Sequence, residues 1–183
     1  MDIQKLYDMQ RVLDQHILDK HEELKEQDNL DWKVLALQVE LGECANEWRG
    51  FKKWSNDRKP RTKVPATAWG EPYKNPLLEE YVDCLHFVLS IGLEIGVEDY
   101  TLNKDLLKPE RYGDKSIIKL FSDLIGSIST LLIIRPHVRA GVYKSIFDDF
   151  VKLGCQLGFA WEQVEQAYLD KNKVNHERQL TGY

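Results

Sequence analysis

The sequence predicts an all-α fold, a single-domain helical bundle of about five or six helices that spans residues 1–183. Apolar side chains recur at steps of three and four along most of the chain, which is the spacing of one helix face. No segment shows the alternation of apolar and polar residues that is typical of a β-strand. A chain of 183 residues, 43% hydrophobic and 30% charged, is long and apolar enough for one complete core.

The first helix is marked by an apolar stripe formed by Leu6, Met9, Leu13 and Ile17. A second helix is expected to begin at Asp31, which can act as N-cap, and to run to about Arg49, where Gly50 can end it. Residues 55–76 contain four prolines and therefore predict a long surface loop, a kind of segment that often serves as a lid.

The remaining helices are expected at about 77–94, 114–134, 141–157 and 160–175. Pro136 ends the second of these helices, because proline cannot continue a helix. The third carries the apolar stripe Ile146, Phe147, Phe150 and Leu153.

Composition narrows the function classes. The formal net charge of −5 makes the chain a poor candidate for general nucleic-acid binding. No apolar run is long enough to span a membrane, so no membrane partner is expected. The three cysteines lack a CxxC pair and indicate free thiols in a reducing compartment. We expect a soluble, cytoplasmic protein.

Four carboxylates occur as two pairs at i, i+3, which places each pair on one helix face: Glu40 with Glu43, and Glu80 with Asp83. No lysine or arginine follows any of them by three or four residues, whereas solvated acidic faces usually have such partners. Oxygen ligands of this kind favour a hard cation, Mg²⁺ before Zn²⁺.

Two other interpretations of the acidic pairs remain open. One is a solvated acidic face without a metal. The other is a di-iron bundle, which requires Glu-x-x-His on two helices. Asp83 and His86 resemble one half of that motif, but no second half accompanies them.

The C-terminal segment adds a basic face, because Lys171, Asn175 and Arg178 follow one another at steps of four and three. Lysine and arginine bind phosphate, and asparagine adds a neutral donor. Cations that complement a helix C-terminus are the simpler alternative. Together with the acidic pairs, this face predicts a metal–polyphosphate site.

Trp48, Phe51 and Trp54 follow the first acidic pair and offer rings that can stack on a base. Core or loop packing is an equal alternative for the first two. Trp54, beside the long loop, is the better ligand candidate.

These residues resemble the dimeric, all-α dUTPases, which are related to the MazG-like nucleotide pyrophosphatases. The chain is most similar to the short forms of Gram-positive bacteria and their phages. The resemblance rests on Gln10-x-x-Leu13-Asp14, on Glu40-x-x-Glu43 with ANEWRGFKKW, on Glu80-x-x-Asp83-x-x-His86, and on the closing KN-x-x-N-x-x-RQ-x-x-GY.

The resemblance implies a role for each matching residue. Two or more Mg²⁺ ions are held by Glu40, Glu43, Glu80 and Asp83, and Glu40 also orients or deprotonates the attacking water. The phosphates are bound by Lys171, Asn175 and Arg178. The nucleoside is contacted by Gln10, Asp14, Trp54, His86 and Phe87. Several relatives have Asn where this chain has Asp14, which leaves the base specificity open.

The implied reaction is hydrolysis of dUTP, and of dUDP as well, by a homodimer. A first alternative is a pyrophosphatase for another nucleotide, such as dCTP. A second is a helical regulatory protein that has lost catalysis.

Overall fold

The computed structural model describes residues 2–66, 73–107 and 117–182, and the expected all-α class is confirmed there. Its six α-helices are α1 (Ile3–Lys20), α2 (Leu30–Trp48), α3 (Pro76–Glu94), α4 (Ile117–Ile133), α5 (Pro136–Leu157) and α6 (Trp161–Thr181). Two 3₁₀-helices, η1 (Glu22–Leu24) and η2 (Lys104–Leu107), lie in the connections. The expected start of the fourth helix at residue 114 lies outside the described residues.

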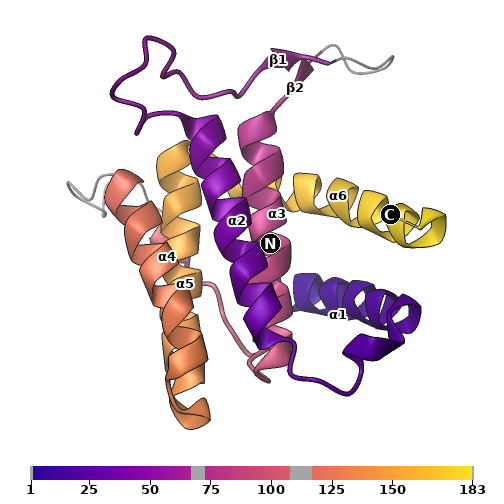
Figure 1. The fold of residues 1–183 in the computed structure, drawn as a ribbon. Helices are drawn as coiled ribbons and strands as arrows, with labels where there is room; N and C mark the ends of the chain where they lie inside the picture. Colours follow the sequence, from indigo (N-terminus) through magenta and orange to yellow (C-terminus); the bar gives the residue numbers. More distant parts are fainter. Residues whose placement is uncertain (1, 67–72, 108–116, 183) are drawn as a thin grey trace.

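The helices form two groups (Figure 1). Helices α2 to α5 stand roughly parallel or antiparallel as an upright bundle. Helices α1 and α6 lie side by side across it and project from α3. None of the described helices is long and apolar enough to cross a membrane. The helices that carry most of the predicted site residues, α1, α2, α3 and α6, therefore meet where the crossing pair joins the bundle.

Helix α3 is the centre of the core, since it packs against α1, α2, α5 and α6. Most of its side chains are buried, and its few charged residues lie in its N-terminal half or at its last position: Glu79, Glu80, Asp83 and Glu94. Tyr81 stacks on Phe150 of α5 at 4.4 Å between ring centroids, and its hydroxyl donates to the Phe150 carbonyl oxygen. This packing fixes the rotation of α3, and with it the direction of its polar residues.

The ends of α2 differ from the prediction. The N-cap residue is Asn29 rather than Asp31, and the carboxylate of Asp28 accepts from the Leu30 N–H at 3.0 Å. At the other end Arg49, not Gly50, adopts the left-handed conformation, with φ of 63°. Its guanidinium binds Asp57 at 3.0 Å, which holds that conformation. Gly50 is needed for space, because a Cβ there would lie 2.3 Å from the Trp48 ring.

The C-terminal helices are longer than predicted. Pro136 ends α4 and also occupies the first turn of α5, where its missing N–H costs nothing. Helix α6 continues past residue 175 to Thr181, and Gly182 ends it with φ of 74°. The basic residues of the C-terminus therefore all lie on one continuous helix.

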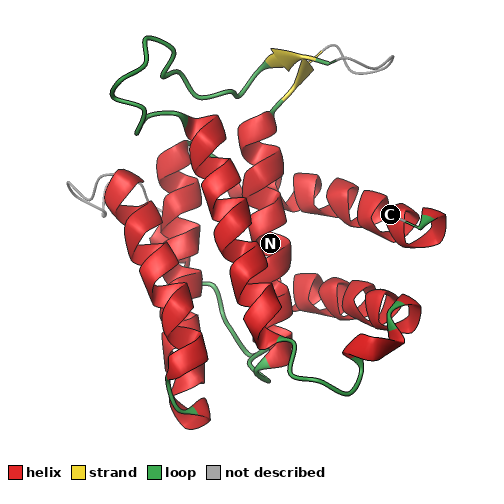
Figure 2. Cartoon of the chain, in the orientation of Figure 1, coloured by secondary structure: helices red, strands yellow, loops and turns green. Residues whose placement is uncertain are grey.

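The loop between α2 and α3 contains a short hairpin that the sequence pattern missed (Figure 2). Strands β1 (Val64–Pro65) and β2 (Tyr73–Lys74) pair antiparallel, with Val64 opposite Lys74. Two residues per strand are too few to show alternation in the sequence.

Candidate functional site

Three of the predicted carboxylates converge where α2 packs against α3. Glu40 of α2 and Glu80 and Asp83 of α3 each offer an oxygen atom, and these oxygens lie within 4.8 Å of one another. All three side chains are half-buried. In the described part of the chain this is the one group of three or more acidic, histidine or cysteine ligands close enough to share a metal ion.

Burial and mutual repulsion make the charged forms of these groups unfavourable. Burial, followed by the charges of Asp83 and Glu43, raises the pKa of Glu40 to about 7. The same causes raise the pKa of Glu80 to about 7. Burial also raises the pKa of Asp83, against the opposing effect of Lys171. A cluster of this kind fits a hard divalent cation, because all its donors are oxygens and it needs positive charge.

The basic face of α6 lies against this cluster. Lys171 Nζ donates to Asp83 Oδ2 at 2.5 Å, and the charges of Lys171 and Arg178 lower the pKa of Glu40. The sequence also allowed these cations to serve only to complement the dipole at a helix C-terminus. That alternative does not fit Lys171, because Lys171 lies in the middle of α6 and contacts Asp83 of α3.

A cavity of about 340 Å³ connects the cluster to the nucleoside-binding candidates. Eight predicted site residues line it: Gln10, Asp14, Glu40, Asp83, His86, Phe87, Asn175 and Arg178. They come from α1, α2, α3 and α6, so the cavity lies where the crossing helices meet the bundle. Acidic, basic and aromatic groups thus share one space.

Four predicted residues lie outside the lining. Glu80 belongs to the acidic cluster beside it, and Lys171 forms an ion pair with Asp83 of that cluster. Glu43 is exposed and does not belong to the three-carboxylate group, although its charge raises the pKa of both glutamates. Trp54 is 78% exposed on the α2–α3 connection, where its ring meets Phe51 edge-on at 5.8 Å.

Several residues that line the cavity or support its walls were not predicted from the sequence. Two of them lie at helical spacing from predicted site residues and could have been identified in that way. Tyr168 precedes Lys171 by three positions, and Ser90 follows His86 by four, so each continues a face already identified. Tyr168 stacks on His86 at 4.2 Å between ring centroids. The other cavity residues are Leu13, Ile17, Trp32 and Gln179.

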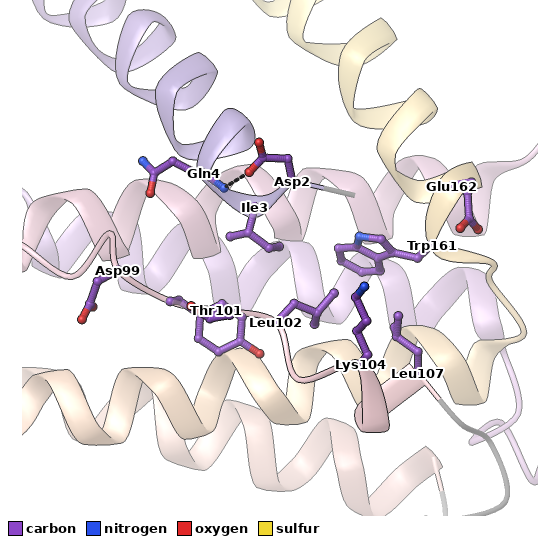
Figure 3. Close-up of a pocket in the computed structure, with 11 residues that line it drawn as sticks. Asp2, Ile3, Gln4, Asp99, Thr101, Leu102, Lys104, Leu107, Trp161 and Glu162 are labelled. Carbon is purple, nitrogen blue, oxygen red and sulfur yellow. Dashed lines mark hydrogen bonds between the residues drawn. The ribbon is translucent and has the colours of Figure 1, made fainter.

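The di-iron interpretation finds no support, because the cluster contains no histidine. His86 instead bonds to Gln10 through Nδ1 at 2.8 Å. A larger hollow of about 760 Å³ lies elsewhere, between the start of α1, residues 99–107 and the start of α6 (Figure 3). Its charged residues are Asp2, Asp99, Lys104 and Glu162, and none belongs to the acidic cluster.

The raised pKa values predict a pH-dependent stability. Without divalent cations, the folded protein holds protons on Glu40 and Glu80 up to about pH 7, whereas the unfolded chain loses them near the ordinary glutamate pKa of 4.5. This contribution to stability is therefore lost as pH rises through 7. We expect Glu80→Gln to raise the melting temperature in EDTA at pH 8 and to leave it nearly unchanged at pH 5.

Thermal melts of the two proteins across pH 5–8 test this expectation. Glu79→Gln, on the same helix, is the matched control. Its side chain is exposed and its charge raises only the pKa of Asp83, as the smallest cause, so it should change the melting temperature far less than Glu80→Gln. An equal effect of Glu80→Gln at both pH values would contradict the repulsion that the cluster implies. Mg²⁺ should stabilise wild type more at pH 8 than at pH 5, since protonated carboxylates bind it poorly.

The comparison with known proteins agrees with this geometry. A family model described as dUTPase matches residues 2–183. No curated protein matches the chain. A match over almost the whole length covers every helix that contributes to the cluster and the cavity. The chain therefore belongs to the all-α dUTPase family and is a nucleoside triphosphate pyrophosphatase.

Proposed function

We propose that this cavity binds dUTP and hydrolyses it to dUMP and pyrophosphate with Mg²⁺, and that dUDP is hydrolysed as well. The observation that carries the proposal is that Glu40 and Asp83 belong both to the carboxylate cluster and to the cavity lined by Gln10, His86 and Arg178. A nucleotide whose base enters the inner part would bring its phosphates to the carboxylates and to α6.

Glu40, Glu80 and Asp83 would hold Mg²⁺, with Glu43 as the fourth ligand. Two observations support this fit. All the donors are oxygen atoms, which hard cations prefer, and the pKa values of Glu40 and Glu80 are raised, which a bound divalent cation would reverse. Mg²⁺ bound there would supply positive charge to the phosphates and the leaving pyrophosphate. The family resemblance favours two or more ions per site.

Glu40 is the proposed general base. It faces the cavity, and a carboxylate oxygen there can accept a hydrogen bond and then a proton from a water molecule beside the phosphates. It would orient the water that attacks the α-phosphorus. Removing a positioned base typically lowers the rate by about 10²–10⁴-fold.

The basic face of α6 would bind the phosphates. Arg178 and Asn175 already line the cavity, and an arginine fork suits phosphate oxygens. Lys171 now forms an ion pair with Asp83. Once a cation neutralises that carboxylate, the Lys171 ammonium group would bind a phosphate oxygen instead. Trp54 would have to move with its loop to reach the nucleoside, since its ring is exposed.

Hydrolysis of dCTP remains the second candidate, and Asp14 is the observation that favours it. Both Asp14 oxygens are acceptors, and the amino group of cytosine is a donor that uracil lacks. The catalytically inactive regulatory protein is disfavoured, because the acidic cluster and the basic face are both present.

A homodimer is also proposed, through an apolar surface on α2 and α4. Its members are exposed and follow helical spacing: Leu35 and Val39 on α2, with Ile118, Ile125 and Leu132 on α4. Gln38 Nε2 donates to Ser129 Oγ at 2.7 Å, and this exposed hydrogen bond joins the two helices. Exposed apolar side chains on two neighbouring helices favour association of two copies. The three cysteines are free thiols, which supports a reducing, cytoplasmic location.

A panel of dUTP, dUDP, dCTP, dTTP and dATP, assayed for pyrophosphate or phosphate release with and without Mg²⁺, tests the activity. We expect Mg²⁺-dependent hydrolysis of dUTP and dUDP only. Glu40→Gln should lower kcat by about 10²–10⁴-fold with little change in KM. Glu79→Gln should retain wild-type turnover, because its side chain is exposed outside the cluster. Equal rates on dCTP and dUTP would refute dUTP specificity.

Light scattering during size-exclusion chromatography tests the dimer. Leu35→Glu places a charge on the apolar surface and should yield monomers. Val12→Glu on α1 is the matched control, since both side chains are 62% exposed, and it should remain dimeric. A dimeric Leu35→Glu protein would exclude this surface as the interface.

A further inference from the structure

We infer that Asp14 is a positioning residue that acts through Gln10 to fix the tautomer of His86, so that the unprotonated Nε2 of His86 accepts a hydrogen bond from the nucleoside. Asp14 thereby sets the direction of the hydrogen bonds at the inner end of the cavity. The identity of the donor rests on the proposed function, whereas the tautomer of His86 does not.

The first step is the orientation of the Gln10 amide. Its Nε2 lies 2.7 Å from Asp14 Oδ1, and a carboxylate oxygen can only accept. Asp14 Oδ2 in turn accepts from the Ser90 hydroxyl at 2.6 Å, and Lys33 Nζ lies 3.6 Å from it. These donors hold the carboxylate in place. A flipped amide would bring two acceptor oxygens together, so the nitrogen of Gln10 faces Asp14.

The second step is the proton on His86. With the amide nitrogen on Asp14, Gln10 Oε1 faces the Tyr168 hydroxyl at 2.9 Å and His86 Nδ1 at 2.8 Å. A carbonyl oxygen has no proton to donate. Tyr168 and His86 are therefore both donors, and the Nδ1 atom of His86 carries a proton.

The third step is the charge of the ring. His86 is 5% exposed and stacks on Tyr168. Burial, and to a lesser degree the charge of Lys171, lowers the pKa of His86 to about 3. A neutral ring with its proton on Nδ1 has a lone pair on Nε2. This atom is buried and makes no hydrogen bond to any described residue.

The unfilled acceptor selects the ligand chemistry. His86 lines the cavity, but its Nε2 is closed to solvent in this structure. Once a small shift of the neighbouring side chains opens this atom, the ligand that is bound best is one that brings a hydrogen-bond donor to it. Apart from its phosphates, dUTP has two donors, the base N3–H and the sugar 3′-hydroxyl. An Asn at position 14 could present either an oxygen or an amino group to Gln10, and so would permit both orientations. Asp14 permits only one.

Two-bond ¹H–¹⁵N correlation spectra of the ¹⁵N-labelled full chain, without nucleotide at pH 7, test the tautomer. The chain has five histidines, and loss of one ring pattern in His86→Gln assigns His86. We expect a pyrrole-type Nδ1 and a pyridine-type Nε2. Asp14→Ala should shift His86 toward a mixture, because Gln10 can then flip. Ser90→Ala removes one hydrogen bond to Asp14 but leaves Lys33 beside the carboxylate and Gln10 bonded to it, so the tautomer should be unchanged. A protonated Nε2 in the wild-type protein would overturn the inference.

Substrate analogues identify the donor. In 3′-deoxy-dUTP the hydroxyl is missing, and in N3-methyl-dUTP the base N–H is blocked. We expect one of them to lose roughly 10- to 100-fold in kcat/KM with the wild-type enzyme, and most of that loss to disappear in His86→Phe. If dUTP is hydrolysed and neither analogue loses activity, the inference fails and the proposed function stands. If dUTP is not hydrolysed while His86 has the expected tautomer, the proposed function fails and the role of Asp14 stands.

Discussion

Like charges held together in a half-buried position are the constraint on which the rest of this site depends. Glu40, Glu80 and Asp83 place oxygens within 4.8 Å of one another between α2 and α3. Burial raises the pKa values of all three, and repulsion within the cluster adds to this effect for Glu40 and Glu80. Folding therefore brings these groups together against their own preference. The packing of α3, most of whose side chains are buried, enforces this arrangement. A divalent cation would relieve this repulsion, and that is the physical basis of the proposed metal site.

Helix α6 supplies the counterpart to this charge. Its Lys171 neutralises Asp83 in the structure, and Arg178 and Asn175 extend the basic face into the cavity. The same helix carries Tyr168, which supports His86 and Gln10 on the opposite side of the cavity. One helix thus joins the proposed phosphate contacts to the nucleoside contacts, and a shift of α6 would alter both.

The helices and the acidic cluster could be predicted because both depend on local spacing. Steps of three and four reveal helix faces, and the absence of nearby lysines favours a metal site over a solvated acidic surface without excluding the latter. The start of α5 was misplaced because Pro136 begins one helix as it ends another. The contact between Lys171 and Asp83 could not be predicted, since 88 positions separate them and only the packing of α6 on α3 brings them together. The role of Asp14 likewise depends on Ser90 and Gln10, which tertiary structure places around it.

The most direct test of the account is a crystal structure of the protein with Mn²⁺, which substitutes for Mg²⁺ and has an anomalous signal, and a non-hydrolysable dUTP analogue. We expect an anomalous peak bounded by Glu40, Glu80 and Asp83, with Lys171 Nζ moved from Asp83 to a phosphate oxygen. Density without a metal at saturating Mn²⁺, with the Lys171–Asp83 ion pair intact, would contradict the claim that this cluster exists to bind a cation.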